Sequence, residues 1–198
     1  YKIGKRIRIE EPEAHFFKMG IPTMGGLLVV FPVAAVTTLL NLASLVRQVT
    51  GRSILLPLGI MLAFCFLGAI DDWEGIHGVR KGDGMKGRIK FAWQMIIAGI
   101  AAIVLYFFLD IHSVAIPTIR VPIDLGLIYI PVAIFIIVGS SNAINFTDGL
   151  DGQAGLVSAT CFAAYGLIAM LQGQVFLMQF CFTMVGALLG FLWFNVHP

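Results

Sequence analysis

Two amides and two carboxylates recur at every third residue within the polar stretch 140–152. They are Asn142, Asn145, Asp148 and Asp151. If this stretch is helical, side chains at that spacing lie along one face. Such an array of oxygens suits a ribose, a diphosphate held with Mg²⁺, or a catalytic base, and Phe146 is placed to stack on a base. The alternative is a turn between two helices, with Asp151 capping the second.

A second acidic motif, Asp71-Asp72, closes an apolar run. A carboxylate at the centre of a bilayer costs about 2.5–3.5 kcal/mol, so this pair belongs near an interface or a wet cavity. Carboxylate oxygens are suitable ligands for Mg²⁺, and the pair also suits a general base. The alternative is a solvated helix end, although negative charge at a helix C-terminus opposes the helix dipole.

Two further stretches are rich in glycine and carry lysines. In the segment 18–26, glycines surround Pro22 and expose backbone amides to an anion, with Lys18 as a point charge. A simple turn at the membrane interface is the alternative. The later loop carries Lys86 and Lys90, which suit a lipid phosphate or a pyrophosphate, or are ordinary cytoplasmic positive charge.

The elements that position these motifs are membrane helices. The 198 residues are 59% hydrophobic and only 12% charged, whereas soluble domains carry about 25% charged residues. This composition excludes a soluble globule and predicts an all-α, polytopic membrane protein. We expect six membrane helices, at about 24–46, 54–72, 89–109, 125–143, 153–171 and 174–194. The segment 110–124 is predicted to be an extended loop.

Six helices place the polar motifs and both ends of the chain on one side of the membrane. That side holds ten of the 13 lysines and arginines. The other side holds Arg47, Arg52 and Arg120. By the positive-inside rule the motif side is cytoplasmic. The distribution of lysines and arginines is the one expected of a membrane protein. We expect no nucleic-acid partner.

The motifs Lys18–Gly26, Asp71-Asp72 and Asn142–Gly152 together resemble the phospho-N-acetylmuramoyl-pentapeptide transferases of bacterial cell-wall synthesis. These enzymes belong to the polyprenyl-phosphate N-acetylhexosamine-1-phosphate transferase superfamily. The resemblance implies transfer of phospho-MurNAc-pentapeptide from UDP-MurNAc-pentapeptide to undecaprenyl phosphate, which yields lipid I and UMP and requires Mg²⁺. It also implies a multi-pass protein of the bacterial inner membrane, surrounded by membrane lipids and present as a homodimer.

The resemblance also implies roles for individual residues. Asp71 is the base for the lipid phosphate or a residue that positions it, Asp72 lies beside it in the cleft, and Asp148 is also catalytic. The substrate-binding positions are Lys18, Thr23, Asn142, Asn145, Phe146, Asp148, Asp151, Lys86 and Lys90. The candidate metal ligands in this sequence are Asp71, Asp72 and Asp151.

The sequence also departs from the family pattern. The family has a helix before the position of Tyr1, and a Phe-Met-Gly-Asp stretch with the main Mg²⁺ ligand after that of Pro198. We therefore expect residues 1–198 to be one transmembrane catalytic domain, part of a ten-helix fold and inactive by itself. Two alternative functions are a related polyprenyl-phosphate GlcNAc-1-phosphate transferase and a transporter or flippase with a proton relay.

Overall fold

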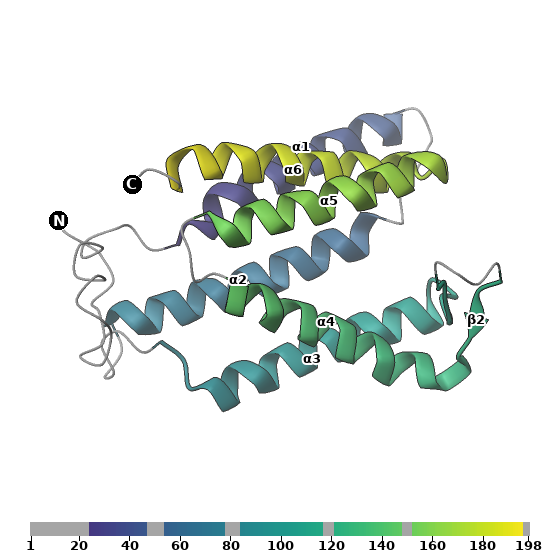
Figure 1. Cartoon of the computed structure of the whole chain (residues 1–198), viewed down its shortest axis with the longest axis horizontal. Coiled ribbons are helices and arrows are strands. Elements are labelled where there is room, and N and C mark those ends of the chain that lie inside the picture. The colour runs from purple at the N-terminus through teal and green to yellow at the C-terminus, as the bar shows by residue number, and fades with distance from the viewer. Residues whose placement is uncertain (1–23, 47–53, 78–83, 117–120, 148–151, 196–198) are drawn as a thin grey trace.

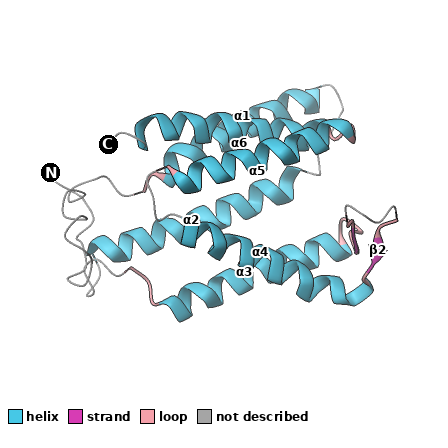
Figure 2. Ribbon diagram, viewed as in Figure 1, coloured by secondary structure: helices cyan, strands magenta, loops and turns pink. Residues whose placement is uncertain are grey.

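The computed structural model describes residues 24–46, 54–77, 84–116, 121–147 and 152–195. Six α-helices dominate these residues (Figures 1 and 2), which confirms the predicted all-α fold class. They are α1 (Gly26–Val46), α2 (Leu55–His77), α3 (Gly87–Phe107), α4 (Tyr129–Thr147), α5 (Gln153–Leu171) and α6 (Val175–Asn195).

The helices form because their residues are apolar over lengths that match a bilayer. Among the described residues, five helices are long and apolar enough to cross a membrane, and α1 contributes the shorter apolar stretch Gly26–Leu42. Large apolar side chains point outward, and Phe31, Phe135 and Trp193 are 76%, 78% and 83% exposed. Water would disfavour such a surface, whereas lipid accommodates it. The chain is therefore a multi-pass membrane protein.

The most extensive contact between helices is the antiparallel pair α5 and α6. A tight turn joins them, with Gly173 in the left-handed conformation at φ 71°. Helix α1 lies against α6, and α3 lies against α4 (Figure 1). The buried apolar cluster joins α1 to α6 through Val33, Phe180 and Cys181.

Gly166 of α5 lies where α5 and α6 approach closely. A Cβ atom at this position would be 3.2 Å from Cys181 Cβ and 3.2 Å from the Phe182 ring. Small residues permit this kind of close packing between membrane helices. We predict that Gly166→Leu destabilises the protein by about 1–3 kcal/mol through overpacking.

The melting temperature of the detergent-solubilised protein measures this effect. Ala164→Leu is the matched control because Ala164 is an exposed position on the same helix. We expect Gly166→Leu to lower the melting temperature and Ala164→Leu to leave it near that of the wild type. Equal melting temperatures for the two variants would contradict the packing described for Gly166.

The two ends of the helix bundle differ in character. One end carries the last turns of α2 and α4 and the first turns of α1 and α3 (Figure 1). The other end carries a small antiparallel hairpin of β1 (Ser113–Val114) and β2 (Ile123–Asp124), followed by a 3₁₀ turn, η3 (Gly126–Ile128). The described helix ends therefore alternate between the two ends of the bundle, as predicted, while the segment predicted as an extended loop contains this hairpin.

Two helix ends differ from the prediction in ways that affect the site. Helix α2 continues past Asp72 to His77, so the acidic pair does not lie in its last turn. The expected conflict between this pair and the helix dipole is therefore weaker than predicted. Helix α4 extends to Thr147, so Asn142 and Asn145 are both helical.

Candidate active site

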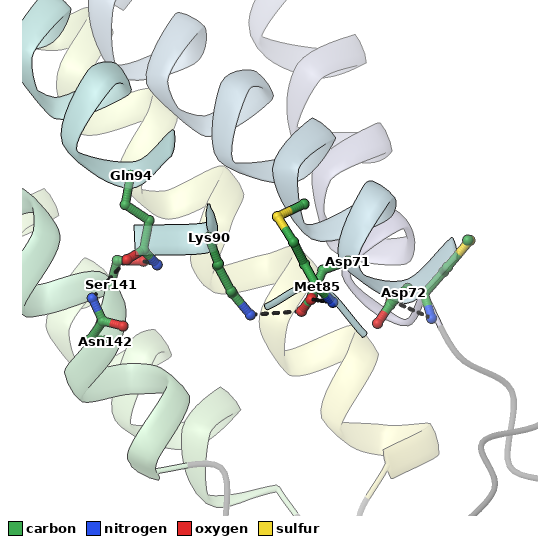
Figure 3. A network of polar contacts seen from close by, with 8 residues as sticks. Asp71, Asp72, Met85, Lys90, Gln94, Ser141 and Asn142 are labelled. Carbon is green, nitrogen blue, oxygen red and sulfur yellow. Dashed lines mark hydrogen bonds and ion pairs between the residues drawn. The ribbon is translucent and has the colours of Figure 1, made fainter. Parts of the chain in front are cut away.

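Asp71 is the best-connected carboxylate among the described residues. Its side chain is 23% exposed, and its two oxygens accept from different donors. The backbone N–H of Met85 donates to Asp71 Oδ1 at 2.8 Å, and Lys90 Nζ donates to Asp71 Oδ2 at 2.7 Å (Figure 3). Asp71 of α2 thus holds the segment that leads into α3. It also forms a half-buried ion pair with Lys90 near the start of α3.

Gly84 makes this contact possible. Its φ of 61° is left-handed, a conformation that side chains with a Cβ rarely adopt. A Cβ added there would lie 2.8 Å from Asp71 Oδ1 and 3.1 Å from the Asp71 carbonyl oxygen. The backbone can therefore approach the carboxylate only because residue 84 is glycine.

Asp72 makes a different contact, toward α1. The backbone N–H of Met24 donates to Asp72 Oδ2 at 3.1 Å (Figure 3). Consecutive helical residues point about 100° apart, which explains why Asp71 is directed to α3 and Asp72 to α1. The two neighbouring carboxylates therefore connect three helix ends at one end of the bundle.

Lys90 and Gln94 extend this polar network along α3. They are four residues apart and so lie on one face of the helix. Lys90 pairs with Asp71, while Gln94 Oε1 accepts from Asn142 Nδ2 of α4 at 2.9 Å. Gln94 Nε2 also lies 3.5 Å from Ser141 Oγ. Helix α3 thus joins the acidic pair of α2 to the first amide of the 140–152 stretch (Figure 3).

The remaining predicted residues fall into two groups. Three are exposed and make none of the contacts of this network, namely Lys86, Asn145 and Phe146. Four lie outside the described residues, namely Lys18, Thr23, Asp148 and Asp151. The structure therefore connects Asp71, Asp72, Lys90 and Asn142, while the functional assignments of all the predicted residues stay predictions.

Three residues that support this network were not predicted as site residues: Gly84, Met85 and Gln94. Met85 contributes only its backbone N–H, which carries no sequence signal. Gln94 did leave a signal, because it is a lone amide inside the apolar run 89–109 and lies one helical turn after Lys90. A polar side chain in a membrane helix usually faces the protein interior, and Gln94 is only 4% exposed.

Asp71 and Asp72 were predicted to help bind Mg²⁺, and in the structure they face nitrogen donors. Among the described ranges, His, Cys, Asp and Glu side chains form no group of three or more that could hold a metal ion. Both oxygens of Asp71 already accept from nitrogen donors. Mg²⁺ is usually held by one or two carboxylates together with substrate phosphates and water, so Asp71 and Asp72 stay predicted metal ligands.

Comparison with known proteins relates this chain to a group of bacterial enzymes. Over 205 aligned residues it is 43% identical to a phospho-N-acetylmuramoyl-pentapeptide-transferase of Chloroflexus aurantiacus, covering 100% of this chain and 54% of that protein. A protein of the same name from Anoxybacillus flavithermus is 38% identical over 201 residues, covering 100% of this chain and 60% of that protein.

The chain thus spans little more than half the length of these curated relatives. The sequence pattern of glycosyl transferase family 4 matches residues 54–198, which include the acidic pair, Lys90 and Asn142. This match covers most of the chain and confirms the resemblance that the motifs indicated. The chain belongs to glycosyl transferase family 4.

Proposed function

We propose that the protein transfers phospho-MurNAc-pentapeptide from UDP-MurNAc-pentapeptide to undecaprenyl phosphate, forming lipid I and UMP. The identity of 43% along the whole chain with a relative named for this transfer carries the proposal. The half-buried Asp71–Lys90 pair supports it, because phosphoryl transfer depends on positioned charge. The alternative transfer of GlcNAc-1-phosphate uses the same chemistry and differs in the sugar.

In the proposed reaction an oxygen of the lipid phosphate attacks the β-phosphorus of the UDP-sugar. A new P–O bond forms to the lipid phosphate, the bond from the β-phosphorus to the bridging oxygen breaks, and UMP leaves with that oxygen. Lys90 neutralises charge on the phosphates, and Asp71 positions Lys90. Asp71 also keeps lone pairs beyond the two hydrogen bonds that it accepts, so its two implied roles, base for the lipid phosphate or a residue that positions this phosphate, both stay open.

Magnesium dependence remains a proposal that rests on the family resemblance. The site is proposed to face the cytoplasm of a bacterial inner membrane, where the nucleotide-sugar is available. The ten-to-three distribution of basic residues in the sequence supports this orientation. Homodimer formation is likewise proposed from the resemblance.

The proposal is tested by purifying the full-length protein and measuring UMP release. The assay contains UDP-MurNAc-pentapeptide, a polyprenyl phosphate and a divalent cation, with UDP-GlcNAc as the competing donor. We expect release that requires the lipid acceptor and prefers the muramoyl donor. Preference for UDP-GlcNAc would favour the related transferase. Absence of UMP with every cation and both donors would contradict an enzymatic function and favour the transporter.

Lys90→Met is predicted to lower the initial rate of UMP release about 10²-fold. The methionine fills a similar volume but removes the charge and leaves Asp71 without its ion-pair partner. Lys90→Arg keeps the charge and is expected to retain more activity than Lys90→Met. Equal rates for the two variants would show that the charge at position 90 does not serve the reaction.

A further inference from the structure

Gln94 is a buried amide within an apolar membrane helix. It is 4% exposed, and it contacts the two consecutive α4 residues Ser141 and Asn142. The contact to Asn142 is short at 2.9 Å, whereas the contact to Ser141 is long at 3.5 Å. Gln94 therefore acts mainly on Asn142, a residue predicted to bind substrate.

The chemistry of the neighbours fixes which way the Asn142 amide points. Asn142 Nδ2 lies 2.8 Å from the backbone carbonyl oxygen of Val138. A carbonyl can only accept, so the group beside it must be the NH₂ of Asn142 and not its oxygen. The second hydrogen of that NH₂ is donated to Gln94 at 2.9 Å. The group of Gln94 that faces Asn142 must in turn be its oxygen.

Both amide hydrogens of Asn142 are thereby used within the protein. The oxygen Oδ1 is the group of this side chain left to meet a ligand, and it is directed away from Gln94 (Figure 3). An amide oxygen accepts hydrogen bonds and repels phosphate oxygens. Asn142 is thus prepared for a hydroxyl or an N–H group of a ligand.

We propose that Gln94 is a positioning residue that holds the amide of Asn142 so that its oxygen receives a hydrogen-bond donor of the nucleotide-sugar. This inference rests on the proposed function. It assigns different substrate groups to two residues of α3. Lys90 serves the phosphates through its charge, and Gln94, one turn later, serves a neutral donor of the nucleoside or sugar through Asn142. The lipid acceptor does not use this contact.

Two variants of the full-length protein test the role of Gln94. Gln94→Met keeps the volume but removes the acceptor, whereas Asn142→Ala removes the amide that Gln94 is proposed to hold. We expect Gln94→Met to raise the KM for UDP-MurNAc-pentapeptide about three- to tenfold, the effect of one hydrogen bond, with the KM for polyprenyl phosphate unchanged. Asn142→Ala should raise the same KM at least as much, because it removes the group that Gln94 holds.

A double-mutant cycle separates this role from packing. If Gln94 acts through Asn142, adding Gln94→Met to Asn142→Ala has little further effect on the KM for the nucleotide-sugar. Additive effects of the two substitutions would overturn the inference. An equal rise in KM for both substrates would overturn it as well.

A binding measurement distinguishes failure of the proposed function from failure of the role proposed for Gln94. Equilibrium binding of UDP-MurNAc-pentapeptide without the lipid acceptor requires no turnover. Wild-type protein that binds the nucleotide-sugar but releases no UMP would contradict the proposed reaction alone. Gln94→Met protein that binds it as tightly as the wild type would overturn the role of Gln94, whatever the rate of UMP release.

Discussion

Asp71→Asn is expected to lower UMP release by the full-length protein about 10²-fold or more. Asparagine has the same shape and still offers an oxygen to the backbone N–H of Met85. It then presents an NH₂ group to the Lys90 ammonium, in place of the oxygen that now accepts from Lys90 at 2.7 Å. The lysine loses its partner and its position, and the site loses a negative charge.

Glu74→Gln is the matched control for this experiment. Glu74 lies on the same helix three residues later, and its side chain is exposed. The same chemical change there removes one negative charge from the same end of the bundle without touching Lys90. We expect a rate near that of the wild type. A similar loss of activity in both variants would mean that general surface charge, and not the Asp71 contacts, governs the rate.

Gly84→Ala is expected to reduce the rate of UMP release about 10²-fold, because small displacements in an active site have effects of this size. The added methyl group would lie 2.8 Å from Asp71 Oδ1, closer than real Cβ contacts allow. In addition, the φ of 61° is unfavourable for alanine by about 1–2 kcal/mol. Either the loop or the carboxylate must move, and the hydrogen bond from Met85 is lost.

Gly87→Ala provides a control within the same segment. A Cβ at Gly87 meets no atom within 4 Å, and Gly87 is the first residue of α3. Alanine favours helix there, so we expect full activity and an unchanged or slightly raised melting temperature. Gly84→Ala with wild-type activity would contradict the importance of the close approach between residue 84 and Asp71.

Much of the fold could be predicted from the sequence because a bilayer imposes simple rules on length and polarity. Helix α5 has the predicted bounds, and the start of α1 and both ends of α6 lie within two residues of their predicted positions. The ends of α2 and α4 were predicted four to five residues too early. Polar residues there signalled the membrane interface, but a helix can continue beyond the hydrocarbon core.

The hairpin at the opposite end was not predicted for a related reason. Its strands have two residues each, and Ser113 pairs with Asp124 across a long connection. Proline and charged residues in this segment indicate a loop correctly, but short strand pairing depends on contacts between residues distant in sequence. Local propensity carries little information about such contacts.

The candidate site was predictable where side chains with strong chemistry stand out from an apolar background. Asp71, Asp72, Lys90 and Asn142 were all identified in this way, although the pairing of Asp71 with Lys90 was not. The contacts of Gly84 and Met85 could not be predicted, since they depend on the backbone path of the α2–α3 connection. Gln94 could have been found by its isolation within an apolar helix.

The transfer to the lipid is tested by following the β-phosphate of the nucleotide-sugar. Full-length protein is incubated with UDP-MurNAc-pentapeptide labelled at that phosphorus, with and without polyprenyl phosphate. We predict that the label appears in a lipid-soluble product only when the lipid is present, and that Asp71→Asn abolishes this transfer while Glu74→Gln does not. If the label never enters the lipid fraction, the proposed transfer is contradicted. If the Asp71→Asn variant transfers as much label as the wild type, the proposed role of Asp71 is contradicted.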